Sequence, residues 1–281
     1  MLPKRNWSDM GWPDFSAGDT SGWIAVLPLA ATEQHGPHLP VGVDTFIADA
    51  YLGRVIAHMP ADLPVTILPV QRIGQSDEHL SFPGTLTFSS TTVIRAWTEI
   101  CECVRRAGIR KLVMVTSHGG NVEAMGIVAR DLRARLGMLA ITAAWHRFGY
   151  PDGLFSADER RHGIHAGDIE TSLVLAHVAD TASADTASAD TVRMDRIASG
   201  EPATVAMQQE FRYLNAHRPA GFGWMSQDLD PSGAIGDPRS ATAEKGAAAL
   251  EFGARAFVEL LLEVHRFDLG RLRDGPLDHA P

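Results

Sequence analysis

Short apolar runs alternate with amphipathic helical patterns along the first half of this chain. The runs are rich in β-branched residues and end in turn formers, which predicts buried strands over 23–30, 65–73, 111–116 and 138–145. Between them, apolar residues recur every three or four positions, which predicts helices over 45–59, 91–107 and 122–136. This order is typical of parallel strands joined by crossover helices. We therefore expect an α/β fold: a doubly wound, mostly parallel sheet with helices on both faces.

The second half of the chain has a looser pattern. Helices are predicted over 168–179 and 241–264. Between them, residues 180–191 repeat small and polar letters, DTASADTASADT, which we interpret as an inserted surface loop or short linker. The 281 residues suffice for one sizeable core, and nothing in the pattern requires a second. We expect a single domain spanning residues 1–281.

Composition excludes several classes of function. The net charge of −9 arises from 34 acidic against 25 basic residues, without a basic run, which argues against a nucleic-acid partner. No apolar stretch has the length of a membrane span or the form of a signal peptide, so we expect a cytoplasmic protein without a membrane partner. Cys101 and Cys103 lie two apart on a predicted helix, which makes them poor disulfide partners. With twelve histidines and only two cysteines, any metal here is held by nitrogen and oxygen.

The loop after the first predicted strand holds Glu33 and His35, and Asp44 lies just before the first predicted helix. Residues two apart in an extended segment face the same side, so Glu33 and His35 can point at one place. Asp44 can fold back onto that place. Two carboxylates and an imidazole can begin a two-metal site. The alternative is a polar turn in which Asp44 only caps the helix.

Two further polar loops follow strands of the same predicted sheet. His118 ends the third strand and precedes Gly119 and Gly120, which permit a tight turn where α/β sheets bind ligands. His165 precedes the helix at 168–179, and Glu170 lies in its first turn. The alternatives are a loop histidine, a surface histidine and a carboxylate placed by the helix dipole. Several such loops at one sheet edge make a shared site the better interpretation.

A fourth polar loop, 74–85, follows the second strand, and we interpret it as a loop that contacts substrate or supports the other polar residues. Trp145 ends the fourth strand, where it serves either as a pocket wall or as core packing. The residues predicted to contact substrate are Ser76, Glu78, His79, Gly119, Gly120 and Trp145. Sequence signatures of a nucleophile elbow, a dinucleotide fold, a P-loop and a His-Glu-x-x-His zinc helix are missing from the chain.

Four ordered segments resemble the creatininase (creatinine amidohydrolase) family. They are TEQHGPHLP at 32–40 with Asp44, FPGT at 82–85, HGGN at 118–121 and HAGDIETS at 165–172. The similarity extends from about Trp7 to Met194, with a continuation toward the end of the chain. It implies a doubly wound α/β amidohydrolase with a binuclear metal centre, usually assembled as a homohexamer.

The resemblance also implies which residues bind metal. One ion would be held by Glu33, Asp44 and His118, and the other by His35, Asp44 and Glu170. The expected cofactors are two divalent ions per chain, Zn²⁺ or Mn²⁺. Ions bridged by Asp44 would lower the pKa of a shared water and so provide a hydroxide. His165 matches the family histidine that transfers a proton.

One departure concerns the substrate. In creatininase proper the metal histidine of the third loop is followed by an aromatic residue and an acid, whereas here Gly119 and Gly120 follow His118. We expect a metal-dependent amidohydrolase that cleaves a non-peptide C–N bond of a cyclic or small amide. Within the family, the alternatives are a deformylase and a peptidase that trims a short peptide. From another class, the alternative is a metal-binding assembly subunit without catalysis.

Overall fold

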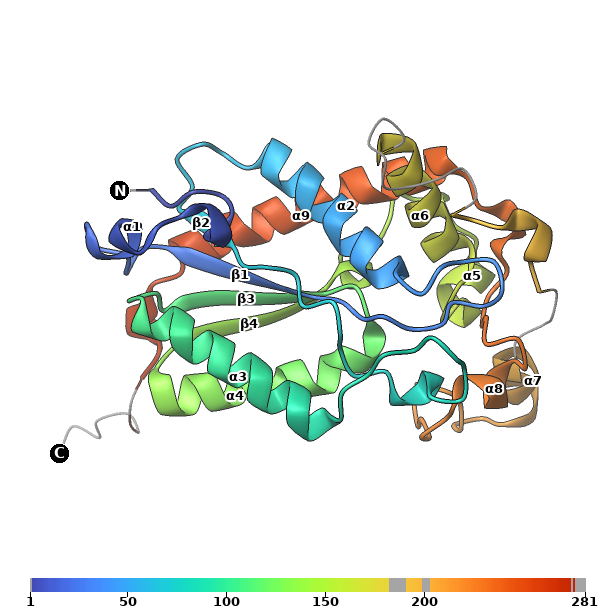
Figure 1. Ribbon diagram of the computed structural model, residues 1–281. Coiled ribbons are helices and arrows are strands. Elements are labelled where there is room, and N and C mark those ends of the chain that lie inside the picture. Colours follow the sequence, from blue (N-terminus) through green and yellow to red (C-terminus); the bar gives the residue numbers. More distant parts are fainter. Residues whose placement is uncertain (1, 182–190, 199–202, 274, 276–281) are drawn as a thin grey trace.

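The computed structural model describes residues 2–181, 191–198, 203–273 and 275, and shows one sheet between two layers of helices (Figure 1). The strands are β1 (Ile24–Leu29), β2 (Val65–Ile67), β3 (Lys111–Thr116) and β4 (Leu139–Ala144). They pair in the order β2-β1-β3-β4, and every pair is parallel. After β1 the chain forms β2 on one side of it and then crosses over to form β3 on the other side. The winding direction therefore reverses between β1 and β3. In such sheets ligands bind beyond the carboxyl ends of the strands at that point.

Helices cover both faces of the sheet, as predicted. One layer holds α2 (Val43–His58), α6 (Asp168–Thr181) and α9 (Ala243–Arg266), and the other holds α3 (Ser90–Arg106) and α4 (Val122–Leu136) (Figure 1). Strand β1 packs against both layers, because successive side chains of a strand point to opposite faces of the sheet. Val26 packs in the hydrophobic cluster of the first layer, whereas Leu27 and Leu29 pack in that of the second.

Several short helices were not predicted from the sequence. They contain one or two turns, which is too short for a recognisable apolar period. The α-helices of this kind are α1 (Trp12–Ser16), α5 (Ala157–His162), α7 (Ala203–Glu210) and α8 (Ser226–Leu229). The 3-10 turns are η1 (Trp7–Asp9), η2 (Asp77–His79), η3 (Gly119–Asn121), η4 (Trp145–Phe148), η5 (Met194–Arg196), η6 (Pro238–Ser240) and η7 (Leu269–Arg271).

Two predicted boundaries near the sheet edge were wrong. Strand β2 ends at Ile67 rather than at residue 73, because Pro69 has no N–H to continue the ladder. The chain still runs beside β1, and the Gln71 N–H donates to the Pro28 carbonyl at 3.0 Å. Helix α2 begins at Val43, so Asp44 lies inside its first turn rather than before it.

Some predictions concern segments at the limit of the described residues. Asp180 and Thr181 form the end of α6, and residues 182–190 of the repeated segment lie outside the described residues, so the inserted loop stays a prediction. Both cysteines are free and lie on α3, as expected from their spacing. Among the described helices, none combines the length and the apolar character that crossing a membrane requires.

Candidate metal centre

The carboxyl edge of the sheet gathers polar side chains from separate parts of the chain. Glu33 and His35 lie in the loop after β1, His118 lies two residues after the end of β3, and Asp44 lies in the first turn of α2. All four are buried, with exposed fractions of 0%, 0%, 5% and 1% in that order. Glu170, in the first turn of α6, completes the set that the resemblance implied. The structure therefore brings together every predicted metal ligand.

Three of the histidines have one ring nitrogen occupied by a backbone carbonyl. Nε2–H of His118 donates to the Gln75 carbonyl at 2.7 Å, and Nδ1–H of His35 donates to the Glu33 carbonyl at 3.1 Å. His165 donates from Nε2–H to the Gln34 carbonyl at 2.6 Å. When such a ring is neutral, its other nitrogen carries a lone pair. Against the effect of burial, the Glu33 charge raises the pKa of His118 well above its ordinary value, so a proton or a cation is held at its Nδ1. Metal-binding histidines are oriented in this way.

Those lone pairs face carboxylate oxygens in two groups. Nδ1 of His118 lies 3.2 Å from Oε1 of Glu33 and 3.9 Å from Oδ2 of Asp44. Nε2 of His35 lies 4.0 Å from the same Asp44 oxygen and 3.7 Å from Oε2 of Glu170. A lone pair facing a carboxylate is repulsive unless a proton or a cation lies between them. Asp44 is shared by the two groups.

Several of these atoms have no hydrogen-bond partner within the described part of the chain. They are both carboxylate oxygens of Glu33, Nε2 of His35 and Oδ2 of Asp44, all buried. Leaving buried polar atoms unpaired is costly, and native proteins rarely do so without a bound ion or water. Oxygen and imidazole nitrogen are the donors that Zn²⁺ and Mn²⁺ accept. The residues present therefore fit a divalent metal centre.

The ionisation of the acids also indicates a need for positive charge. Burial would raise the pKa of Glu33, but the facing His118 imidazole holds it well below its ordinary range. Burial and the Glu33 charge raise the pKa of Asp44 well above its ordinary value. Burial raises the pKa of Glu170 to about 7. Several buried carboxylates cannot all be ionised together unless cations neutralise them.

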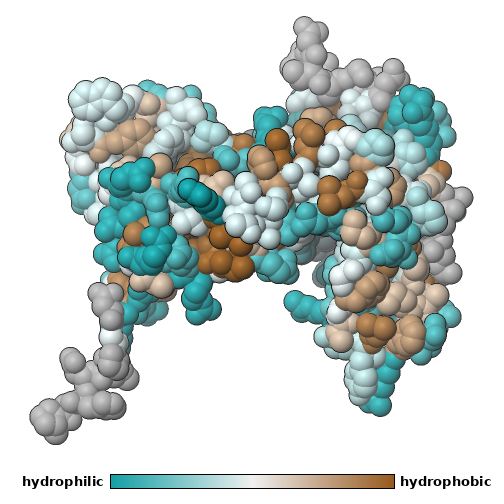
Figure 2. All heavy atoms as spheres, turned by 60° about the horizontal axis from the view of Figure 1, so that its bottom comes forward, coloured by the Kyte–Doolittle hydropathy of each residue, from teal (hydrophilic) through white to brown (hydrophobic). Residues whose placement is uncertain are grey.

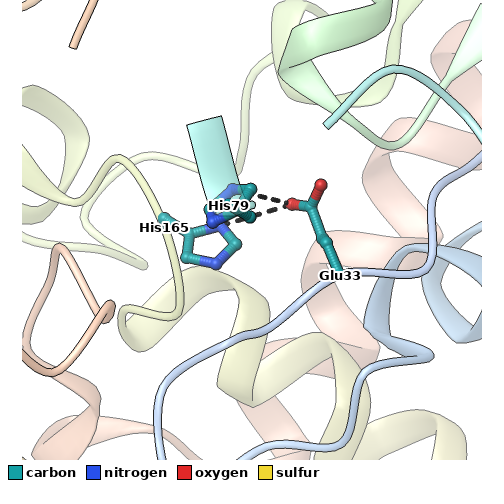
Figure 3. A group of neighbouring side chains, drawn as sticks. All are labelled: Glu33, His79 and His165. Atoms are coloured by element: carbon teal, nitrogen blue, oxygen red, sulfur yellow. Dashed lines mark ion pairs between the residues drawn. The ribbon is translucent and has the colours of Figure 1, made fainter. Parts of the chain in front are cut away.

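His79 differs from the other histidines of the site. Its Nδ1 lies 2.7 Å from Nε2 of Gln34, an amide that also donates to the Gly233 carbonyl and is thereby oriented. Nε2 of His79 lies 3.2 Å from Oε1 of Glu33 without the alignment of a hydrogen bond. Figure 3 shows Glu33 pointing toward both His79 and His165. We interpret His79 as a residue that positions Glu33.

A strained turn positions Glu170. Ala166 has a φ of 58°, in the left-handed region that residues other than glycine seldom adopt. In this conformation its backbone N–H donates to Oε2 of Glu170 at 2.6 Å. Glu159 supports the start of the same helix, because its Oε1 accepts from the backbone N–H of Ile169 at 3.0 Å. Strain of this kind is usually kept where function needs it.

The creatininase family, described as creatinine amidohydrolase, matches residues 8–261. This chain belongs to the creatininase family. The match covers nearly the whole chain, confirms the resemblance of its motifs, and makes the protein a creatininase-family hydrolase.

Named relatives in the creatininase family differ in their substrates. The mycofactocin precursor peptide peptidase of Mycolicibacterium smegmatis is 33% identical over 225 residues, which cover 79% of this chain and 78% of the relative. The protein of the same name from Mycobacterium ulcerans is 35% identical over 235 residues, 80% of each chain. The creatinine amidohydrolase of Pseudomonas putida is 25% identical over 276 residues, 91% of this chain and 95% of the relative.

Solved creatininase structures share the fold. One titled "Creatininase Mn" superposes with a TM-score of 0.70 at 23% identity, covering 94% of this chain and 100% of the other. A creatininase variant of "Zn-Zn type" gives a TM-score of 0.69 at 24% identity, with the same coverage. These similarities confirm the α/β fold that the strand and helix pattern predicted.

Most residues predicted to contact substrate surround the His118 side of this creatininase-family centre. Oγ of Ser76 lies 3.5 Å and Oε1 of Glu78 lies 3.6 Å from Nε2 of His118. Gly119 has open space where a side chain would begin, whereas Gly120 is closely surrounded. Their contact with substrate stays a prediction.

Trp145 lies in the hydrophobic core, which is the alternative that the sequence left open. It is 2% exposed, its ring stacks on Tyr51 at 4.3 Å, and it packs against Phe257 at 4.8 Å between ring centroids. These contacts give Trp145 a packing role between the sheet and its first helical layer. They provide no support for a pocket wall.

Sequence reasoning missed three residues that hold the site. Gln34 stands inside the TEQHG segment, so its position between Glu33 and His35 was a usable signal. Ser226, on α8, lies with Oγ 2.6 Å from Nδ1 of His79, and no local pattern marks it. Gly233 supplies the carbonyl that orients Gln34. The last two reach the site only through tertiary folding.

Proposed function

We propose that this protein is a two-metal amide hydrolase. One divalent ion would be held by Glu33, Asp44 and His118, and the other by His35, Asp44 and Glu170. The observation that carries the proposal is Oδ2 of Asp44, an unpaired buried oxygen that faces imidazole nitrogens of both groups at 3.9 and 4.0 Å. The solved family members with manganese and with a Zn-Zn pair support Mn²⁺ or Zn²⁺ as the ions.

Bound ions of this kind act as Lewis acids and activate water for attack on a carbonyl carbon. The protein contributes His165, which lies against the same cluster, with Nδ1 3.7 Å from Oε1 of Glu33. Burial, together with His35, lowers the pKa of His165 well below its ordinary value, so the ring is neutral. With Nε2–H held by Gln34, the open atom Nδ1 is an acceptor. We assign His165 to substrate contact, where Nδ1 accepts a proton or hydrogen bond from the reacting groups.

The proposed substrate is a short peptide that loses a terminal residue. Support comes from the mycofactocin precursor peptide peptidases, which are 33–35% identical over about four-fifths of the chain. A small or cyclic amide is the second candidate, and the Pseudomonas putida creatinine amidohydrolase, covered over 95% of its length, favours it. Replacement of the acid by Gly120 in the third loop weighs against creatinine itself.

The test is a panel of amides given to protein loaded with Zn²⁺ or Mn²⁺. The panel holds short peptides, creatinine, hydantoin, other lactams and formamides, and amine release is measured before and after chelation. We expect about two ions per chain and metal-dependent cleavage of at least one peptide. Binding of zero or one ion would refute the two-metal arrangement, and two bound ions without any amide cleavage would favour a non-catalytic assembly subunit.

Assembly and compartment belong to the same proposal. Exposed apolar side chains follow α7, namely Phe211, Tyr213, Leu214 and Phe222. Figure 2 shows apolar side chains on the right-hand lobe, the part that carries α7 and α8. Such a surface supports association of several copies, and the resemblance indicates a hexamer. The proposed location is the cytoplasm, which the two free cysteines support.

The test of the hexamer is separate. Light scattering during size exclusion would show six chains, and a monomer would contradict the assembly.

A further inference from the structure

Glu78 lies at the rim of the candidate metal centre. Its Oε1 is 3.6 Å from Nε2 of His118, and one of its oxygens lies within 4.8 Å of a Glu33 oxygen. Its side chain is 20% exposed, whereas Glu33 is 0% exposed and Asp44 is 1% exposed. A single water molecule can bridge two oxygens at that separation. Glu78 therefore places a carboxylate between the buried ligands and solvent.

The glycine at position 120 keeps the space that this carboxylate fills. A Cβ on Gly120 would lie 2.7 Å from Oε1 of Glu78, and 2.5 Å from both the Gln75 carbonyl oxygen and Nε2 of His118. A Cβ on Gly119 would meet nothing within 4 Å. The two neighbouring glycines thus differ: position 120 admits no side chain while Glu78 holds its place.

The backbone of Glu78 is fixed by buried neighbours. Its carbonyl accepts from Oγ of Ser226 at 3.0 Å, and the same hydroxyl lies 2.6 Å from Nδ1 of His79. Ser76, two positions before Glu78, and His79, directly after it, are 0% and 2% exposed. The turn η2 is thereby anchored, so the backbone that carries the Glu78 side chain is fixed at the rim of the centre.

Amide hydrolysis requires a proton at the leaving nitrogen, and at the start of the reaction neither the neutral His165 ring nor the residues assigned to metal hold a free proton for it. His165 has its Nε2–H committed to the Gln34 carbonyl at 2.6 Å, which leaves a lone pair at Nδ1. Glu33 and Asp44 are assigned to metal. Glu78 is a carboxylate close enough to share a water with them and open enough to exchange a proton with substrate.

We propose that Glu78 is a catalytic residue that carries a proton from the attacking water to the leaving nitrogen, which rests on the proposed amide hydrolysis. As the water oxygen bonds to the carbonyl carbon, one water proton moves to the Glu78 carboxylate and the carbonyl electron pair moves to oxygen. The C–N bond then breaks, its electron pair goes to nitrogen, and Glu78 returns the proton there. The products are a carboxylic acid and an amine, and the Glu78 carboxylate is restored.

The test compares Glu78→Gln and Glu78→Ala with the wild-type protein, loaded with Zn²⁺, on the panel amide that the wild type cleaves fastest. We expect kcat to fall by about 100-fold or more in both variants, with KM little changed. Metal content, measured by mass spectrometry after gel filtration, should equal that of the wild type. Asp77→Asn is the matched control, because Asp77 is an exposed acid in the same turn. It should keep wild-type turnover.

Rescue of turnover by added formate distinguishes a catalytic role of Glu78 from a purely structural one. Glu78→Ala leaves a space that formate can enter, so added formate should restore part of its turnover, whereas Glu78→Gln fills the space and should not respond. Wild-type turnover in Glu78→Gln, parallel loss of metal and turnover, or an Ala variant that formate does not rescue would each overturn the proposal. Failure of the proposed function is distinguishable, since the wild-type protein itself would then cleave no amide.

Discussion

Nδ1 of His118 lies 3.2 Å from Oε1 of Glu33, although the two residues are 85 positions apart and follow different strands. They meet because β1 and β3 are neighbours in a parallel sheet, and their carboxyl ends open at the same edge. The winding direction reverses between these two strands, so neither following segment covers the gap. The fold therefore creates the place where the metal centre is proposed.

Loss of Asp44 should remove both metal ions. Its Oδ2 faces both imidazole groups, so Asp44→Ala deprives each ion of a ligand at once. We expect bound metal to fall from about two ions to fewer than one per chain, with amide cleavage lost in parallel. Metal analysis after gel filtration measures this. Asp49→Asn, a change of a more exposed acid on the same helix, is the control and should retain both ions. Retention of both ions in Asp44→Ala would refute the assignment.

Loss of the His79 ring should weaken metal binding without removing a ligand. His79 lies 3.2 Å from Glu33 and is itself held by Gln34 and Ser226. Residues that orient a metal ligand typically contribute roughly 10- to 100-fold in metal affinity, and we expect a loss of that size in His79→Ala. Competition with a fluorescent zinc chelator measures the affinity. His58→Ala changes a surface histidine paired with Glu251 and should leave it unchanged. If His79→Ala binds zinc as tightly as His58→Ala does, His79 does not position Glu33 for metal binding.

The convergence of Glu33, His35 and His118 was predictable from their positions after strands, whereas the full set of proposed ligands, with Asp44 and Glu170, came from the family resemblance. Glu33 and His35 are two apart after an apolar run, and His118 lies two residues after another run, so sheet geometry alone aligns them. The helix at 168–179 likewise places Glu170 in a first turn.

The supporting residues were not predictable for a physical reason. Ser226 and Gly233 reach the site from far along the chain, through a segment whose helices are too short to show a period. Gly120 marked the loss of an acid from the third loop, but the sequence did not show which residue occupies the space. The structure brings the Glu78 carboxylate to that space from another loop. The spacing of residues within one segment cannot show that a carboxylate from another loop occupies this space.

Removal of the His165 ring should separate turnover from metal binding. Its Nδ1 lies 3.7 Å from Glu33, but the two proposed ion sites are complete without it. We expect His165→Ala to keep about two ions per chain while kcat falls by roughly 100- to 10,000-fold. His162→Ala, a nearby histidine that contacts Thr204, should keep both properties. A parallel loss of metal and turnover in His165→Ala would place His165 among the ligands instead.

Glu159 should make folding stability depend on pH. Burial raises the pKa of this carboxyl to about 7, and Asp168 and Asp237 add to the shift. In the unfolded chain the group ionises near its ordinary value of 4.5, so between about pH 4.5 and 7 the native state binds more protons than the unfolded state. The contribution to stability is therefore fully present below about pH 4.5 and is lost as the pH rises through about 7.

The Glu159→Gln variant isolates this contribution, because its side-chain oxygen can still accept from Ile169 but the group no longer ionises. Urea unfolding of both proteins at pH 5, 6, 7 and 8 (about one unit apart) gives the free energy of unfolding at each point. From pH 5 to 8 the wild-type value should fall relative to the variant, by up to about 3 kcal/mol. Using the difference between the two proteins cancels the pH dependence of groups that Glu159 does not influence, while Glu170, whose pKa Glu159 helps to raise, contributes to it together with Glu159. Identical slopes would show that Glu159 ionises in the native state as it does in the unfolded chain.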